Sequence, residues 1–138
     1  MKLFAHRDYV DQYGIPSSVD EMPKHRLICH SPDSPQVSAG VRWIEPFLSA
    51  NNSSVMMVNN YFGILQAVLH GFGIGALPHY LTLDFPELVT VLPDIVSDPV
   101  PVFLAYPEEL RNSKRVNAFR DFVIKEMMED KKKVQDKE

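Results

Sequence analysis

The sequence predicts an α/β fold, and three stretches carry the prediction. Residues 55–58 form an apolar strand pattern that leads directly into a helix pattern over 61–69. A short apolar stretch over 73–76 follows, so strand, helix and strand come in succession. Residues 101–106 are apolar on both alternating faces, which is typical of a strand that helices cover on both sides. Together these stretches predict helices packed on a parallel or mixed sheet.

Short elements separated by turns precede this unit. Ser17 lies three residues before Asp20, and Ser18 lies three before Glu21, which is the capping-box spacing at a helix start. Pro23 limits the predicted helix to one turn. The remaining predicted elements are a strand over 2–5, a helix over 6–13 that ends at Gly14, strands over 26–30 and 40–44, and a loop over 49–54.

The central helix has well-defined predicted ends. The side chain of Asn59 or Asn60 is placed to accept a hydrogen bond from a first-turn amide. Gly71 follows the last apolar position, where many helices end with a residue of positive φ. Gly71, Gly73 and Gly75 follow a helix, whereas a dinucleotide fingerprint places its glycines between a strand and the next helix. We therefore expect these glycines to allow close packing of the helix end on the strand.

The last third of the chain predicts a short helix over 79–83, a strand over 88–92 and a final helix. Asn112 or Ser113 is suited to cap the final helix. Residues 130–138 contain only one apolar residue, Val134, and are expected to be disordered. The final helix has an apolar stripe at helical spacing, formed by Val116, Phe119, Val123 and Met127.

Composition indicates one soluble domain. The 138 residues are 45% hydrophobic and 23% charged, which is ordinary for a globular chain. Cys29 is the only cysteine and lies in an apolar run, which favours a buried, inert thiol over a redox sensor and suits a reducing compartment. The first residues lack the apolar core of a signal peptide, and no stretch approaches the ~18 apolar residues of a membrane span. We expect a cytoplasmic protein without membrane contact.

The charges are distributed unevenly. Residues 27–110 contain one lysine or arginine, Arg42, against eight acidic residues, whereas residues 111–125 contain five cations and one acid. The acidic body opposes binding to a phosphate backbone. The cations of the final helix are typical of a solvated face, since no aromatic or motif support for nucleic-acid contact accompanies them. We expect no direct binding to nucleic acid.

Neither a metal site nor a catalytic site is predicted. None of the five histidines is paired at i, i+4 on a helix or has a cysteine or acid at ligand spacing. Glu108 and Glu109 lie at a strand-to-helix connection, where exposed acids are ordinary. The chain has no G-x-S-x-G motif, and Cys29 has no suitably placed histidine. We expect a protein that is not an enzyme and uses no cofactor.

Six segments, in order from about Leu3 to Val123, resemble the effector-binding domain of LysR-type transcriptional regulators. No single segment is diagnostic, and the resemblance lies in their order. The central segment consists of an Asn at the helix start, the apolar helix, the run from Gly71 to Pro78, and Tyr80-Leu81. The flanking segments are Leu3-Phe4-Ala5 with Tyr9-Val10 and Tyr13-Gly14, Met22 with His25-Arg26-Leu27-Ile28, Leu92-Pro93, the run 102–107, and the run 113–119.

The resemblance implies a three-layer α/β fold similar to the second lobe of a type-2 periplasmic-binding-protein fold. It implies an effector-binding domain fragment over 1–129, with the second lobe over 6–100, crossing and returning segments over 1–5 and 101–129, and a charged tail over 130–138. Members of the family begin with a winged helix-turn-helix domain and a first sensor lobe, and we expect neither in this sequence. The expected function is small-molecule effector sensing for transcriptional regulation, without DNA binding by this chain.

The resemblance also places the effector site. In the family, the loop before the central helix faces the cleft between two lobes and touches the effector. By position Asn59, Asn60 and Tyr61 take that role, and His6 in the crossing segment lines the same cleft. From the residues alone, the two asparagines serve equally well as a cap and a turn.

The charge pattern predicts weak binding. Between residues 27 and 110 the only cation is Arg42, so an anionic effector lacks a salt-bridge partner unless Arg42 or Arg7 folds toward the cleft. We expect half a cleft to bind no small molecule more tightly than about 0.1 mM. Because the final strand and helix pack on the first lobe in the family, we also expect the chain to dimerise, to refold this segment against the second lobe, or to aggregate. Of these outcomes we expect a homo-oligomer.

Two alternatives remain open. A solute-binding module of a transport system shares the fold, although the absence of a signal peptide disfavours it. A truncated gene product without a binding function is the other. An in-frame helix-turn-helix encoded upstream of Met1 would distinguish these readings.

Overall fold

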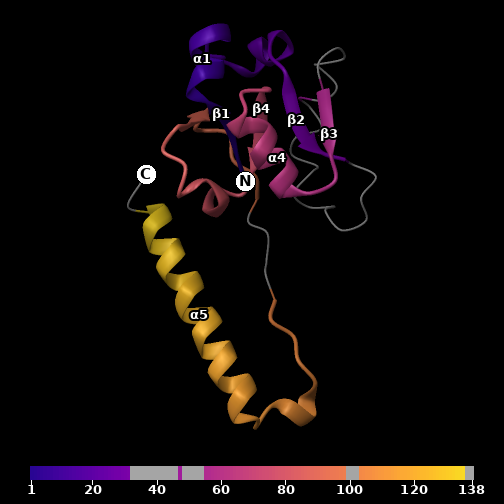
Figure 1. Ribbon diagram of the computed structural model, residues 1–138, viewed down its shortest axis with the longest axis vertical. Coiled ribbons are helices and arrows are strands. Elements are labelled where there is room, and N and C mark those ends of the chain that lie inside the picture. Colours follow the sequence, from indigo (N-terminus) through magenta and orange to yellow (C-terminus); the bar gives the residue numbers. More distant parts are fainter. Residues whose placement is uncertain (32–46, 48–54, 99–102, 136–138) are drawn as a thin grey trace. The chain divides into compact units, whose positions relative to one another are not determined.

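The structure, a computed structural model, describes residues 1–31, 47, 55–98 and 103–135 (Figure 1). The predicted strand over 40–44 and loop over 49–54, together with Arg42, lie outside the described residues. The chain divides into two compact units, Met1–Val100 and Pro101–Glu138, which are described separately.

The first unit is built on a five-stranded mixed sheet with the order β3-β2-β4-β1-β5. Strands β2, β3 and β4 are parallel, and β1 is antiparallel to both β4 and β5. The α/β prediction is confirmed. The strand bounds are β1 (Lys2–His6), β2 (Leu27–His30), β3 (Val55–Val58), β4 (Ile74–Leu77) and β5 (Leu88–Val91).

Helices cover both faces of this sheet and give three layers. Helix α4 (Tyr61–Leu69) packs on one face, while α1 (Arg7–Tyr13) and the 3₁₀ helix η1 (Val19–Lys24) contribute to the core of the other (Figure 1). Alternation along β1 explains this, since Phe4 joins the α4 core and Leu3 and Ala5 join the other core. Each fully buried large apolar side chain contributes about 1.5–3 kcal/mol. The sheet is therefore fixed from both sides.

The ends of α4 form as the sequence predicts. Asn60 is the N-cap, and Gly71 has φ +68°. The amide of Gly71 donates to the Val68 carbonyl and that of Phe72 to the Ala67 carbonyl, which is the Schellman arrangement. At Gly75, a Cβ atom would collide with a methyl group of Val68. The glycines thus serve a sharp helix end and close packing of α4 on β4.

Two local predictions differ from the structure. Ser18 is the N-cap of η1 but its side chain makes no capping bond. Instead the Glu21 carboxylate accepts from the Ser17 amide at 2.8 Å and from its hydroxyl at 2.9 Å. The segment 79–83 is a 3₁₀ helix, η2 (His79–Thr82). The strand predicted over residues 2–5 is present as β1, which lies inside the sheet between β4 and β5.

The second unit consists of the 3₁₀ helix η3 (Glu108–Leu110) and the long helix α5 (Lys114–Gln135). The prediction of a strand buried on both faces is wrong for residues 103–106, which form no strand, with Phe103 84% exposed. A strand needs a hydrogen-bonded neighbour, and the described residues offer none to this segment. Helix α5 runs through Gln135, six residues into the stretch predicted to be disordered. In the described part of the chain, no helix is long and apolar enough to span a membrane.

Candidate functional site

The ends of the three parallel strands meet at one edge of the sheet, which we call the carboxyl edge. Strand β2 ends there at His30, β3 at Val58 and β4 at Leu77. Because β1 runs in the opposite direction, Lys2 pairs with Leu77 and begins at the same edge. In open α/β sheets, ligands bind in crevices beyond the carboxyl ends of the strands. The residues just past these ends are therefore the candidate site.

Asn59 and Asn60 connect β3 to α4 at this edge. The Oδ1 atom of Asn60 accepts a hydrogen bond from the Gly63 amide at 2.7 Å, and its Nδ2 group donates to Oδ1 of Asn59 at 2.8 Å. The capping role inferred from the sequence is thus present. Both side chains remain exposed, as does Phe62 in the first turn of α4, whose first amides carry the positive end of the helix dipole. The linked asparagines therefore present polar groups to solvent beside these amides.

Tyr61 begins α4 and contacts the end of β2. Its ring centroid lies 5.4 Å from that of His30, with an interplanar angle of 53°. Burial raises the pKa of Tyr61 above its ordinary value, and nearby Tyr80 adds to the effect. The His30 ring is buried, with Nδ1 3.2 Å from the Ser31 carbonyl oxygen. The partly buried ring of Tyr61 and the buried ring of His30 thus lie next to the two asparagines.

His6 lies elsewhere. It ends β1, where it pairs with Leu88, and it is the N-cap of α1, with Nδ1 accepting from the Asp8 amide at 3.1 Å. This end of the sheet, where β2, β3 and β4 begin, is the amino edge. At about 3.3 Å per residue, His6 lies about 13 Å along β1 from Lys2. The structure brings Asn59, Asn60 and Tyr61 together but does not bring His6 to them.

The structure adds three residues to the carboxyl edge that the sequence did not single out: Lys2, His30 and Tyr80. Lys2 shares a face of β1 with Phe4 and thus lies on the α4 side of the sheet. It supplies a cation at the edge, whereas Arg7 follows His6 at the opposite one. These three residues share one feature, since each flanks the end of a strand. To recognise from this feature that they lie at the same edge, one must know the direction of β1, which the sequence does not reveal.

The chemistry of the described residues is that of binding. Cys29 is fully buried, and burial raises the pKa of its thiol to about 11, so it is not a nucleophile at neutral pH. Within residues 1–31, 47, 55–98 and 103–135, no group of three or more His, Cys, Asp or Glu side chains is placed to hold a metal ion. The exposed amides, asparagines and aromatic rings of the carboxyl edge are suited to hydrogen bonding and stacking with a small molecule.

Comparison with known proteins gives a consistent result. The family model for the LysR substrate binding domain matches residues 1–128. YhjC of Escherichia coli K12, an uncharacterized HTH-type transcriptional regulator, is 27% identical over 136 aligned residues, covering 91% of this chain and 44% of the regulator. The chain therefore spans less than half the length of this relative.

Solved structures share the fold. The regulatory domain of CrgA, a LysR-type transcriptional regulator from Neisseria meningitidis, matches with a TM-score of 0.70 at 20% identity, covering 91% of this chain and 63% of that one. The regulatory domain of AphB from Vibrio vulnificus matches with a TM-score of 0.60 at 20% identity, covering 89% and 63%. The sheet and helices described above are thus those of a LysR regulatory domain.

Proposed function

We propose, on the premise that this chain belongs to the LysR substrate-binding domain family, that its carboxyl edge senses a small-molecule effector for transcriptional regulation. The chain spans 44% of its curated relative and 63% of the matched regulatory domains. We therefore propose that gene regulation is the function of the whole protein and that this chain contributes the contact with the effector. We propose no catalytic role, since its relative is named as a transcriptional regulator.

One observation carries the proposal: Asn59, Asn60 and Tyr61 lie together beyond the carboxyl ends of the parallel strands. The Asn59–Asn60 hydrogen bond fixes the loop, and His30 packs against the Tyr61 ring. A ligand here would meet a pre-formed surface with few rotamers left to order. We assign effector contact to Asn59, Asn60 and Tyr61. His6, also assigned from the family resemblance, would need a ligand or a first sensor lobe that reaches the amino edge.

The affinity of the chain alone should be low. A neutral hydrogen bond contributes about 0.5–1.5 kcal/mol, and the helix dipole about 0.3–1 kcal/mol. A dissociation constant of 1 mM already needs about 4 kcal/mol. Two or three such contacts on one open edge therefore give millimolar binding, and we expect nothing tighter than about 0.1 mM.

Calorimetry against a panel of small carboxylates and amino acids tests this site. The isolated chain should show no affinity tighter than about 0.1 mM, and fusion to a first sensor lobe should restore binding. In that fusion Asn60→Leu should abolish binding while the fold persists by circular dichroism. Asn60→Asp is the matched control for the helix, because aspartate keeps an acceptor for the Gly63 amide. A micromolar ligand of the bare chain that is unaffected by Asn60→Leu would refute the assignment.

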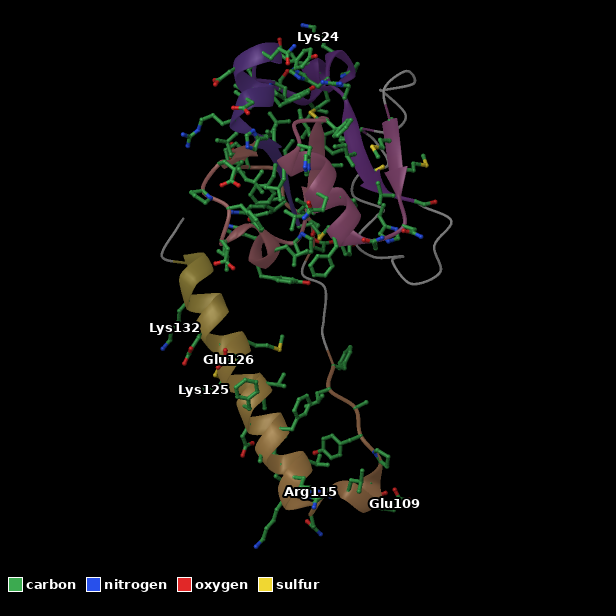
Figure 2. All side chains as sticks on the ribbon, viewed as in Figure 1. Lys24, Glu109, Arg115, Lys125, Glu126 and Lys132 are labelled. Atoms are coloured by element: carbon green, nitrogen blue, oxygen red, sulfur yellow. The ribbon has the colours of Figure 1, made fainter. Side chains whose placement is uncertain are left out.

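We further propose that the chain works in the cytoplasm, forms a homo-oligomer and does not itself bind DNA. The proposed association surface consists of exposed apolar side chains of α5, a helix whose polar residues include Arg115, Lys125, Glu126 and Lys132 (Figure 2). Its large apolar side chains are between 44% and 62% exposed, namely Phe119, Phe122, Ile124, Met127 and Met128. Exposed patches of this kind commonly mark interfaces.

Light scattering with size-exclusion chromatography tests the association. Phe119→Ser with Phe122→Ser should lower the measured mass toward that of a monomer, whereas the polar control Arg115→Ser should not. A monomeric wild-type chain that stays monomeric at high concentration would contradict the proposal.

DNA binding is tested by a gel shift, and a salt-dependent shift at micromolar protein would contradict its proposed absence.

A further inference from the structure

A buried polar cluster joins α1, η1 and the start of β2 at the amino edge, away from the proposed effector site. Tyr9 of α1 is 2% exposed and His25, just before β2, is 7% exposed. The Tyr9 hydroxyl lies 3.3 Å from Nδ1 of His25 and accepts a hydrogen bond from the Arg26 amide at 3.1 Å. One hydroxyl thus connects a helix to the residues that open a strand.

The geometry and the burial together favour a neutral His25. Since the Arg26 amide donates to the Tyr9 oxygen, the phenolic proton is available to donate to Nδ1 of His25. Burial lowers the pKa of His25, and a neutral imidazole with its proton on Nε2 offers Nδ1 as the acceptor for that proton. A protonated imidazole has donors on both nitrogens. The phenolic proton would then lose this acceptor inside a buried site, where an unmade hydrogen bond is costly.

Charged groups of η1 and β2 and the Tyr13 ring of α1 lie close to the cluster. On η1, Glu21 favours a protonated His25, whereas Lys24, which extends into solvent (Figure 2), disfavours it. On β2, the Arg26 guanidinium lies 5.5 Å from the Tyr9 ring centroid and 4.8 Å from that of Tyr13. Burial is the largest influence and lowers the pKa of His25, in agreement with the hydrogen-bond geometry.

We propose that the Tyr9–His25 contact is an acid-sensitive latch, whose opening on protonation of His25 frees α1 from the start of β2. The folded state prefers neutral His25, so the latch is fully closed above the ordinary histidine pKa of about 6.5 and weakens as pH falls below that value. The carboxyl edge and α4 contain no part of the latch. Acid should therefore loosen α1 selectively and leave the α4 region closed.

Amide hydrogen exchange of the full chain, followed by NMR, tests the latch. Corrected for intrinsic exchange, opening of α1 should increase about tenfold for each unit by which the His25 pKa lies below its value in the open state. We expect this rise between pH 7.5 and 5 in α1 amides and not in α4 amides. Equal behaviour of the two helices, or a measured His25 pKa that is not below the ordinary value of about 6.5, would overturn the proposal.

Three variants separate His25 from the other histidines. His25→Gln keeps an acceptor for the Tyr9 hydroxyl without titrating, and should make α1 opening independent of pH. His6 also caps α1 and lies 3.5 Å from an Asp8 carboxylate oxygen, so it is the necessary comparison. His6→Asn keeps a capping acceptor and should retain the full pH dependence, as should His70→Gln. Loss of the pH dependence in His6→Asn and not in His25→Gln would assign the effect to the helix cap. Should His25→Gln fail to fold, the titration of His25 in the wild-type chain decides.

Discussion

The two edges of the sheet use similar residue types in opposite ways. At the amino edge, the Tyr9 hydroxyl, His25 and the Arg26 amide are paired with one another in a buried cluster. At the carboxyl edge, Asn59 and Asn60 are exposed, and Tyr61 is half-buried beside His30. Groups that pair with each other hold elements together, whereas exposed groups on a fixed loop remain able to bind a ligand. We propose that the amino edge mainly stabilises the fold and that the carboxyl edge binds the effector.

The largest change in stability is expected from a substitution in β2, a core strand that runs between both edges of the sheet. Ile28 is 1% exposed in the middle of β2 and belongs to the α4 core. Ile28→Ala should lower the free energy of unfolding by about 2–5 kcal/mol, through lost burial and the cavity left behind. Chemical denaturation measures this. The control Ile15→Ala, at a side chain that is 49% exposed, should stay within about 0.5 kcal/mol of wild type. Equal effects would mean that β2 is not the core strand described.

The second largest change in stability is expected from the loss of a tyrosine hydroxyl at the amino edge, and the same loss at the carboxyl edge should have little effect. Tyr9→Phe keeps the ring but leaves the Arg26 amide without its acceptor and His25 without its donor. Unsatisfied buried groups cost about 1–3 kcal/mol, so the variant should lose that much stability by denaturation. Tyr80→Phe is the matched change at the carboxyl edge, on a side chain that is 59% exposed, and should be nearly neutral. If the two variants lose equal stability, the amino edge has no special structural role.

A smaller effect is expected at the helix cap. Asn60→Ala removes the acceptor for the Gly63 amide and should cost about 0.5–2 kcal/mol. Asn59→Ala removes only an exposed hydrogen bond between side chains and should cost less. Thermal unfolding of both variants checks the order. A larger loss for Asn59→Ala would mean that the loop, and not the cap, holds the start of α4.

The smallest effect concerns acid stability and distinguishes Glu21 from His25. Hydrogen bonds from the Ser17 amide and hydroxyl, and then from Lys24, lower the pKa of Glu21 to about 2. A lowered carboxyl pKa contributes stability above the ordinary value of about 4.5 that is lost as pH falls toward 2. Glu21→Gln should therefore flatten the stability profile below about pH 4.5, whereas His25→Gln flattens it below about 6.5. A Glu21→Gln profile that keeps the wild-type loss of stability between pH 4.5 and pH 2 would contradict this assignment.

The structural features that the sequence predicts correctly are those that depend on residues close together in the chain. The cap at Asn60 and the positive φ of Gly71 follow from side-chain chemistry within one helical turn, and both are present. The α/β class follows from the succession of patterns around α4. The family resemblance depends on motif order and is confirmed by the family match.

The parts that the sequence does not predict depend on distant pairing. The direction of β1 places Lys2 at the carboxyl edge and His6 at the amino edge, and only the pairing of β1 with β4 and β5 reveals this. The apolar pattern of residues 103–106 predicts a strand but cannot show whether a neighbouring strand exists. In the same way, the contact of His30 with Tyr61 joins residues 31 positions apart.

Mapping of ligand-induced NMR shifts on the whole chain tests most directly whether the carboxyl edge is the binding edge. Millimolar additions of the small carboxylates and amino acids used for calorimetry suit this measurement, since NMR detects weak binding. We expect at least one compound to shift the amides of Asn60 and Tyr61 and the ring of His30, while the amides of α1 stay in place. Binding that shifts His6 and α1 and leaves Asn60 and Tyr61 unchanged would contradict the account.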